Sequence, residues 1–229
     1  MTKPSSLRSW TELSTLAEES SGEDWLFRGE PADGEPLKPK AGRVSKDPGS
    51  PRKLAYRIEH EKEALSEFKR RARPYLSHTP SSDLEWLAIA QHHGLPTRLL
   101  DWTENLFAAA FFAVEKAGTK GNAVIYGLKD FRILDEGEEK IPFNIKSVGA
   151  YFPPHITPRI PAQASVFTVH PDPTVVFDPP GLSKWVLSHT ACNGIKRVLD
   201  SCAINEGSLF PDVVGLSRYL AWRYKWGKF

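Results

Sequence analysis

Apolar positions along the chain recur at two spacings, one typical of helices and one typical of strands. A spacing of three to four residues, as in Trp10, Leu13 and Leu16, predicts a helix with one buried face. By this criterion we expect helices at 9–19, 52–73, 83–92, 104–116, 191–201 and 212–224. Short runs rich in aliphatic and aromatic residues predict strands at 25–29, 123–128, 159–169 and 185–187. Helices and strands do not strictly alternate, so the predicted class is α+β, with a small mixed or antiparallel sheet flanked by helices.

The length of 229 residues is enough for one large domain or two small ones, and no internal repeats appear. We expect residues 1–229 to form a single domain, with a core over about 10–225. The stretch 31–50 holds four Pro and several Gly, which predicts a mobile loop that folds over a site. The stretch 129–150 is expected to be irregular, and 173–177 is either a loop or a strand.

Capping residues mark the ends of two central helices. Ser82 or Asp83 is expected to cap the helix that follows it, and Gly94 to end that helix. Thr103 or Asp101 is expected to cap the apolar helix that begins near residue 104.

Composition narrows the class of protein. Apolar residues make up 40% of the chain and there are seven Trp, enough for a core and for ring-lined pockets. A formal net charge of +2 argues against a strong general affinity for nucleic acid. No leader-like start and no run of 18 apolar residues appear, so we expect a cytoplasmic protein with no membrane partner. Cys192 and Cys202 fit no metal spacing and are expected to be free, buried thiols, and no metal is expected.

The segment 91–103, Gln-His-His-Gly-Leu-Pro-Thr-Arg-Leu-Leu-Asp-Trp-Thr, is the densest group of polar side chains. It leads directly into an almost wholly apolar helix, so each polar group needs a partner. One interpretation is a closed internal network of Thr97, Arg98, Asp101 and Thr103, in which the Asp101 carboxylate accepts from Arg98. The other is the wall of a ligand pocket.

In the pocket interpretation, Trp102 offers a surface on which a flat ligand stacks, and His92 or His93 provides polar contacts. Gln91 belongs to the same wall. Either histidine alone is more often structural than catalytic, so this interpretation depends on the density of the whole cluster.

Arg28 ends an apolar strand and is followed by Gly29. A guanidinium among apolar residues needs a carboxylate, a phosphate or a carbonyl as its partner. Arg28 is therefore either a ligand anchor, with Gly29 allowing close approach, or one half of an internal ion pair, for example with Asp101. Gln163, expected in a strand, is neutral and can orient a hydroxyl but cannot act as a base.

Three segments together resemble the FRG domain family, which takes its name from a Phe-Arg-Gly signature. They are 25–29, 91–103 and Arg159-Ile160 with Gln163 and Phe167-Thr168, and the closing Leu-Phe-Pro-Asp at 209–212 also fits. The resemblance covers about residues 10–225, with departures at His93, where the family often has Tyr, and at 164–165, where it often has a Gly. It implies a bacterial or phage-borne protein linked to defence or to toxins.

The order of elements is also similar to that of the Arg-Ser-Glu class of ADP-ribosyltransferases. In that class an aromatic-Arg-Gly strand precedes a Ser/Thr motif, an Ala-x-x-Phe-Ala helix and a later strand that carries a catalytic Glu. Here Gln163 stands near the position of that Glu, so another acid such as Asp101 or Glu206 is a candidate for its role. The likeness implies an ADP-ribosyltransferase-like fold that binds NAD or a related nucleotide, in which Arg28 holds a pyrophosphate or the nicotinamide ribose.

The resemblances lead to two sets of expected site residues. The catalytic set is Arg28, Thr97, Asp101 and Gln163, and the cofactor-binding set is Phe27, Arg28, Gly29, Gln91, His92, Arg98, Trp102 and Thr103. Three hypotheses follow: a transferase acting on an unknown macromolecular target as a toxin or defence effector, a non-catalytic module that binds a nucleotide or a phage component, and a purely structural polar network. An antitoxin or another defence protein is an expected partner. The ligand hypotheses require Arg28, the 97–103 segment and Gln163 to meet at one cleft.

Overall fold

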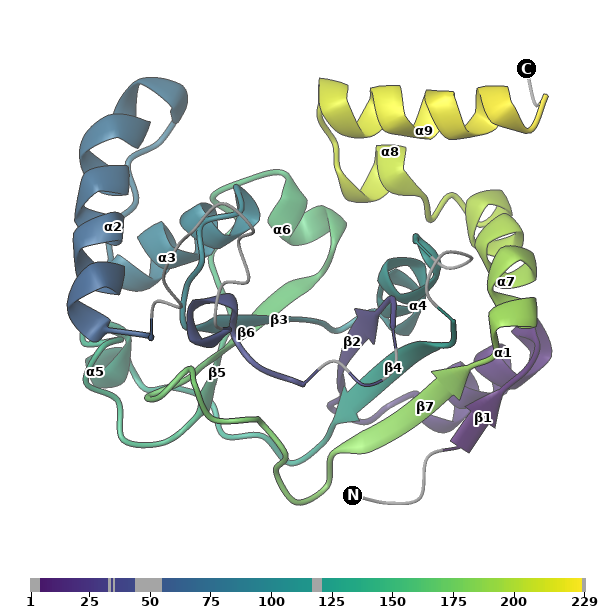
Figure 1. Cartoon of the computed structure of the whole chain (residues 1–229), viewed down its shortest axis with the longest axis horizontal. Helices are drawn as coiled ribbons and strands as arrows, with labels where there is room; N and C mark the ends of the chain where they lie inside the picture. Colours follow the sequence, from purple (N-terminus) through teal and green to yellow (C-terminus); the bar gives the residue numbers. More distant parts are fainter. Residues whose placement is uncertain (1–4, 33, 35, 44–54, 117–120, 228–229) are drawn as a thin grey trace.

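The computed structural model describes residues 5–32, 34, 36–43, 55–116 and 121–227. Within these residues the strands form one seven-stranded mixed sheet in the order β1-β7-β4-β2-β3-β6-β5 (Figure 1). Neighbouring strands are antiparallel except for the parallel pair β1 and β7. The strands are β1 Ser5–Leu7, β2 Leu26–Glu30, β3 Leu99–Thr103, β4 Ala123–Leu128, β5 Gly149–Tyr151, β6 Ser165–Val169 and β7 Ser183–Leu187. The α+β class is confirmed.

Helices flank this sheet and follow the predicted periodicity closely. They are α1 Trp10–Glu19, α2 Ile58–Ala72, α3 Asp83–His92, α4 Leu106–Val114, α5 Glu136–Glu139, α6 Arg159–Ala162, α7 His189–Ser201, α8 Glu206–Leu209 and α9 Val213–Lys225, with 3-10 turns η1 Lys40–Gly42 and η2 Arg73–Tyr75. Ser82 caps α3, as predicted, because its hydroxyl accepts from the Glu85 amide at 3.2 Å. The helices predicted at 83–92, 191–201 and 212–224 are therefore confirmed within about two residues of their ends.

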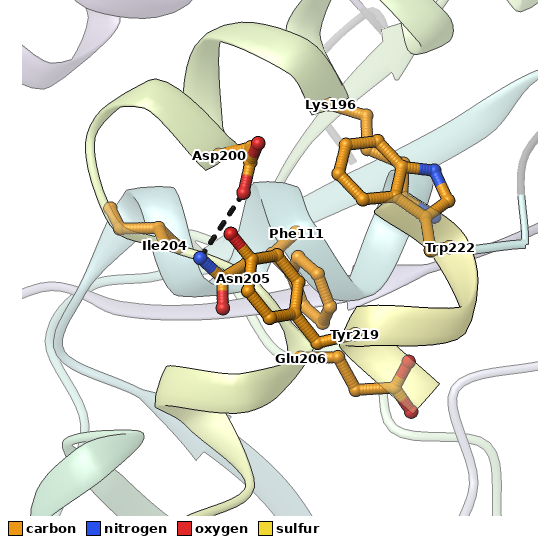
Figure 2. Close-up of a pocket in the computed structure, with 8 residues that line it drawn as sticks. All are labelled: Phe111, Lys196, Asp200, Ile204, Asn205, Glu206, Tyr219 and Trp222. Carbon is orange, nitrogen blue, oxygen red and sulfur yellow. Dashed lines mark hydrogen bonds between the residues drawn. The ribbon is translucent and has the colours of Figure 1, made fainter. Parts of the chain in front are cut away.

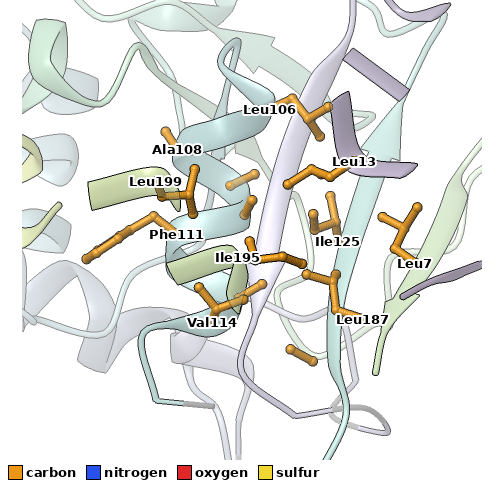
Figure 3. Packing of buried hydrophobic residues seen from close by; sticks show 14 of the residues in the cluster. Leu7, Leu13, Leu106, Ala108, Phe111, Val114, Ile125, Leu187, Ile195 and Leu199 are labelled. Carbon is orange, nitrogen blue, oxygen red and sulfur yellow. The ribbon is translucent and has the colours of Figure 1, made fainter. Parts of the chain in front are cut away.

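The main apolar cluster lies where α1, α4 and α7 cover β2, β4 and β7. Figure 3 shows side chains from these elements, among them Leu13, Ile125, Leu187 and Ile195, converging on a common core. Gly29 lets α4 lie directly on β2, because a Cβ at this position would overlap the Ala109 carbonyl oxygen. A second cluster joins α2 and α3 to β3, β5 and β6.

Several predicted elements differ in the structure, each for a local reason. The helix predicted over 52–73 begins at Ile58, because Arg57 is extended and acidic residues that favour a helix start first appear at Glu59; residues 52–54 lie outside the described part. The strand predicted over 159–169 begins only at Ser165. Residues 159–162 form α6 instead, since Pro161 lacks the amide that a sheet requires.

Three further expectations are corrected. Asn105 caps α4, in place of Thr103 or Asp101, because its side-chain oxygen accepts from the amides of the next turn. The stretch predicted to be irregular contains α5 and β5, and 173–177 is a loop. Both cysteines are free thiols, but Cys202 is exposed because it follows the last turn of α7.

Candidate functional site

A cavity of about 350 Å³ lies where β2 and β3 diverge. The two strands pair only at Phe27 and Thr103, whereas β2 pairs with β4 at five successive positions. The cavity is lined by Phe27, Arg28, Gly29, Pro31, Lys40, Gln91, His92, Asp101, Trp102, Thr103, Phe112, Glu115, Lys116, Arg159, Gln163, Ser165 and Phe210. The structure thus brings Arg28, Asp101 and Gln163 to one cleft. Thr97 and Arg98, also expected there, do not line it.

Arg28 occupies the gap between the diverging strands. Its Nη1 donates to the Asp101 carbonyl oxygen at 2.7 Å and lies 3.5 Å from the Asp101 carboxylate. Its Nε and Nη2 donate to Glu30 Oε1 at 2.9 and 2.6 Å. Burial by itself would lower the pKa of Arg28, but the carboxylates of Glu30 and Asp101 outweigh it and raise that pKa. The internal ion pair with Asp101 is therefore present, and Glu30 is a second partner that the sequence did not indicate.

Asp101 is the carboxylate that opens into the cavity. Its side chain is 45% exposed, and its Oδ2 accepts a hydrogen bond from Gln91 Nε2 at 3.0 Å. The Gln91 amide is oriented in turn by Thr97, whose hydroxyl donates to Gln91 Oε1 at 2.8 Å. Thr97 and Gln91 therefore position the Asp101 carboxylate, and Thr97 does so without reaching the cavity.

Arg98 does not pair with Asp101, contrary to the predicted network. It is fully buried, and its Nη2 donates to Glu61 Oε2 at 2.9 Å. Its backbone amide also donates to Glu61, and Tyr56 accepts a further bond from the guanidinium. A cation in the interior requires a carboxylate beside it, and α2 provides one from 37 residues away. Arg98, expected to contact a cofactor, therefore joins α2 to β3 and does not line the cavity.

Trp102 borders the cavity with a ring that is already packed. The side chain is 3% exposed, and its indole N–H donates to the Thr168 hydroxyl at 2.9 Å. Phe177 contacts the ring edge-on. The expected stacking surface is therefore covered. The aromatic pair Phe112 and Phe210, with ring centroids 6.0 Å apart, lines the cavity instead.

Gln163 ends α6 and does not lie in a strand. Its Nε2 donates to the Leu209 carbonyl oxygen at 2.8 Å, and its own carbonyl accepts from the Thr103 hydroxyl at 2.6 Å. The residue thus ties β3 and α6 to α8. The predicted strand position is wrong, because the chain turns through Ala164, whose φ of 43° lies in the left-handed region.

His92 and Arg159 form the side of the cavity nearest to α6. Burial lowers the pKa of His92 to about 4, so its imidazole is neutral at neutral pH. Arg159 Nη1 donates to the His92 carbonyl oxygen at 3.0 Å, and the guanidinium also pairs with Asp212. His93 points elsewhere and lines a neighbouring cavity.

The charged lining is predominantly positive. Arg28, Lys40, Lys116 and Arg159 contribute cations, against the carboxylates of Asp101 and Glu115. Sequence reasoning missed all of these except Arg28 and Asp101 as site residues. Arg159 and Phe210 belong to the segments that resemble the FRG family, and that resemblance was sufficient to include both among the expected site residues.

The loop expected to fold over a site reaches the cavity through Pro31 and Lys40. Its part at 36–43 is held in place, since the Ala41 amide donates to the Thr97 carbonyl oxygen at 3.1 Å. Residues 33, 35 and 44–50, where mobility was predicted, lie outside the described residues.

Residues 23–122 match the FRG domain family. The chain carries an FRG domain. The FRG match includes Arg28 and the whole 91–103 segment, and it ends before Arg159 and Gln163. No curated protein and no solved structure shows significant similarity to the chain.

Two features are absent from the described residues. No helix among them is long and apolar enough to cross a bilayer. No group of three or more His, Cys, Asp or Glu in the same residues is placed to hold a metal ion.

Proposed function

We propose that the FRG domain of this chain binds NAD or a related nucleotide in the cavity between β2 and β3. The observation that carries the proposal is the lining of this cleft, in which Arg28 meets the 91–103 segment and cationic side chains outnumber carboxylates. Phosphates favour such sites because hydrogen bonds from charged arginine and lysine side chains to phosphate oxygens are short and strong. The cavity volume of about 350 Å³ lies in the range of small-molecule sites.

In this proposal the phosphates, the ribose and the ring of a nucleotide each contact different residues of the cavity lining. Arg28, held rigidly by Glu30 and Asp101, is oriented in advance to meet a pyrophosphate or a ribose. Lys40 from η1 adds positive charge to the same lining. Phe112 and Phe210 offer an aromatic contact for a nicotinamide or adenine ring.

We further propose that the domain is an ADP-ribosyltransferase-like enzyme, acting on a macromolecular target as a toxin or defence effector. Transfer breaks the bond between nicotinamide and ribose and joins the ribose carbon to an acceptor nucleophile. Positive charge develops on the sugar, and a carboxylate beside it lowers the barrier. Asp101 supplies that carboxylate, and the proton that the acceptor loses passes to water.

A non-catalytic binding module is the second candidate. The observation in its favour is Gln163, a neutral amide already committed to the Leu209 carbonyl, at the position where transferases of the Arg-Ser-Glu class have a glutamate. Such a module would recognise a nucleotide or a partner without cleaving the glycosidic bond. Nicotinamide released from NAD, followed by chromatography, separates the two candidates.

Calorimetric titration with NAD and with ADP-ribose tests the shared claim of binding. We expect saturable heat with the parent protein and a loss of affinity of tenfold or more in Arg28→Gln, since removal of a charged hydrogen-bonding group costs about 1.5–3 kcal/mol. The matched control is Arg70→Gln, an exposed arginine on α2 whose partner is Glu67. Absence of binding up to millimolar ligand, in a protein that unfolds cooperatively, would contradict both candidates.

A further inference from the structure

The face of α9 that points away from the molecule is apolar. Six of the twelve large apolar side chains that are exposed among the described residues belong to this helix and its C-cap, Trp226. Val213, Val214, Leu216 and Leu220 are 79, 54, 50 and 39% exposed, and we call these four the outer stripe. The spacing of 213, 216 and 220 places these three on one side of the helix, and Val214 borders them next to Val213. Exposed aliphatic groups in such a row mark an interaction surface.

The opposite face of α9 is already occupied. A Cβ at Gly215 would overlap the Phe210 carbonyl oxygen, so the helix lies directly on α8. Figure 2 shows Tyr219 and Trp222 turned toward α7, beside Asp200 and Lys196, around a small cavity. The Lys196 ammonium lies 5.4 Å from the Trp222 ring. The outer stripe is thus not needed to attach α9 to the fold.

The charge of α9 indicates an anionic partner. Its sequence contains Arg218, Arg223 and Lys225 and no acidic residue. Arg218 lies 3.4 Å from Glu206 but its side chain is 63% exposed. A second copy of the chain would bring two such basic helices together, which like-charge repulsion opposes.

Area also argues against a protein partner held by α9 alone. A helix of 13 residues is about 20 Å long and 10 Å wide, which gives a face of roughly 200 Å². Stable protein interfaces bury about 800 Å² on each partner. A lipid surface has no such requirement, because apolar insertion and attraction to anionic headgroups act together on a single helix.

Further positive charge lies on the same side of the molecule. The last turn of α2 contains Lys69, Arg70 and Arg71, and Arg73 follows in η2. Lys69 pairs with Asp83, and Arg70 and Arg71 share Glu67, so the four cations outnumber these two carboxylates. A cavity of about 230 Å³ is lined both by 75–78, directly after this turn, and by 211–212, directly before α9. Figure 1 shows the end of α2 and the whole of α9 along one edge of the molecule.

We propose that α9 is a peripheral docking surface for anionic lipid. The outer stripe lies at the boundary of headgroups and acyl chains, and Lys225 with the cations at the end of α2 contacts the headgroups. This contact differs from the sequence-based expectation of no membrane partner, which considered only segments that span a bilayer. It does not depend on the nucleotide proposal.

Sedimentation with lipid vesicles tests this surface. The full chain is incubated with vesicles of phosphatidylcholine alone or of phosphatidylcholine mixed with phosphatidylglycerol. We expect binding to the anionic vesicles to be at least about tenfold tighter, and to weaken as salt is added. We expect Leu216→Gln with Leu220→Gln to reduce that binding about tenfold or more, and Lys225→Gln to reduce it about fivefold.

The matched control is the double variant Val175→Gln and Val176→Gln. It removes two exposed aliphatic side chains from a loop outside α9, and we expect it to bind like the parent. Equal binding of the α9 double variant, or no binding to anionic vesicles, overturns the proposal. Concentration-dependent dimerisation that the α9 variant abolishes, without vesicle binding, overturns it in favour of a second copy.

Discussion

Asp101 is the residue at which the polar groups of the site converge. Its backbone carbonyl holds Arg28, and its carboxylate accepts from Gln91. Thr97 orients Gln91, so the carboxylate has one preferred position although nearly half of its surface is exposed. At this scale the structure departs from the closed network, because the Asp101 carboxylate contacts Gln91 and Arg28 while Arg98 pairs with Glu61. The hydrogen bonds that satisfy Thr97 and Gln91 also orient that carboxylate at the cavity.

Replacing Asp101 by Asn removes the negative charge of the side chain and keeps its size and shape. Under the transferase proposal we expect Asp101→Asn to reduce the rate of nicotinamide release by about 10²-fold or more, because an amide cannot stabilise a developing cation. NAD affinity is expected to change much less, since Arg28 retains Glu30 and the Asp101 carbonyl. The measurement is single-turnover release at saturating NAD. An unchanged rate would show that the Asp101 carboxylate does not take part in the transfer reaction.

Between elements, the contact of β2 with α4 decides where Arg28 lies. Gly29 has no side chain, so the backbone of α4 approaches β2 at Ala109 and Ala113. The sequence interpretation left open whether a ligand or another backbone approaches this glycine closely. The structure shows that a helix makes the close approach, and the position of the Arg28 side chain follows from that packing.

Two identical substitutions at different glycines test this packing. We expect Gly29→Ala to destabilise the fold by about 1–3 kcal/mol or more, because backbone atoms must move to admit the methyl group. Gly194→Ala, within α7 and with no atom near its added Cβ, is expected to stabilise by up to about 1 kcal/mol. Urea unfolding measures both. A neutral effect at Gly29 would mean that α4 moves away without cost.

For the whole molecule, two buried histidines link stability to pH. Burial lowers the pKa of both His92 and His170 to about 4. His170 is 2% exposed, and its Nε2 lies 2.9 Å from the Thr168 hydroxyl. Both rings are neutral in the folded protein and protonate readily once it unfolds.

The sign of the pH effect follows from these two states. Above the ordinary histidine pKa of 6.5, neither state binds the protons and stability is highest. Between 6.5 and about 4 the unfolded state takes them up, so each histidine costs up to about 3 kcal/mol of stability. We expect the melting temperature to fall through this range, and less steeply in His170→Gln. The control His155→Gln, at an exposed position, should follow the parent.

Periodicity and motif spacing determined the local elements and the family. The apolar stripe of 10–19, the capping residue Ser82 and the strand that carries Arg28 depend on neighbours a few residues away. Most of the expected site residues line the cavity, because most of them belong to the two motifs at 25–29 and 91–103. The FRG motif places Arg28 and the 91–103 segment in one recognisable order.

Tertiary structure alone decided which polar groups pair and which face the cavity. Arg98 binds Glu61 across 37 residues, and β1 pairs with β7, almost at the other end of the chain. Gln163 reaches the Leu209 carbonyl, and Trp102 is covered by Phe177. Such partners leave no periodic signal in the sequence. A buried charge or ring requires a complementary group beside it in the fold, and that group can come from any position along the chain.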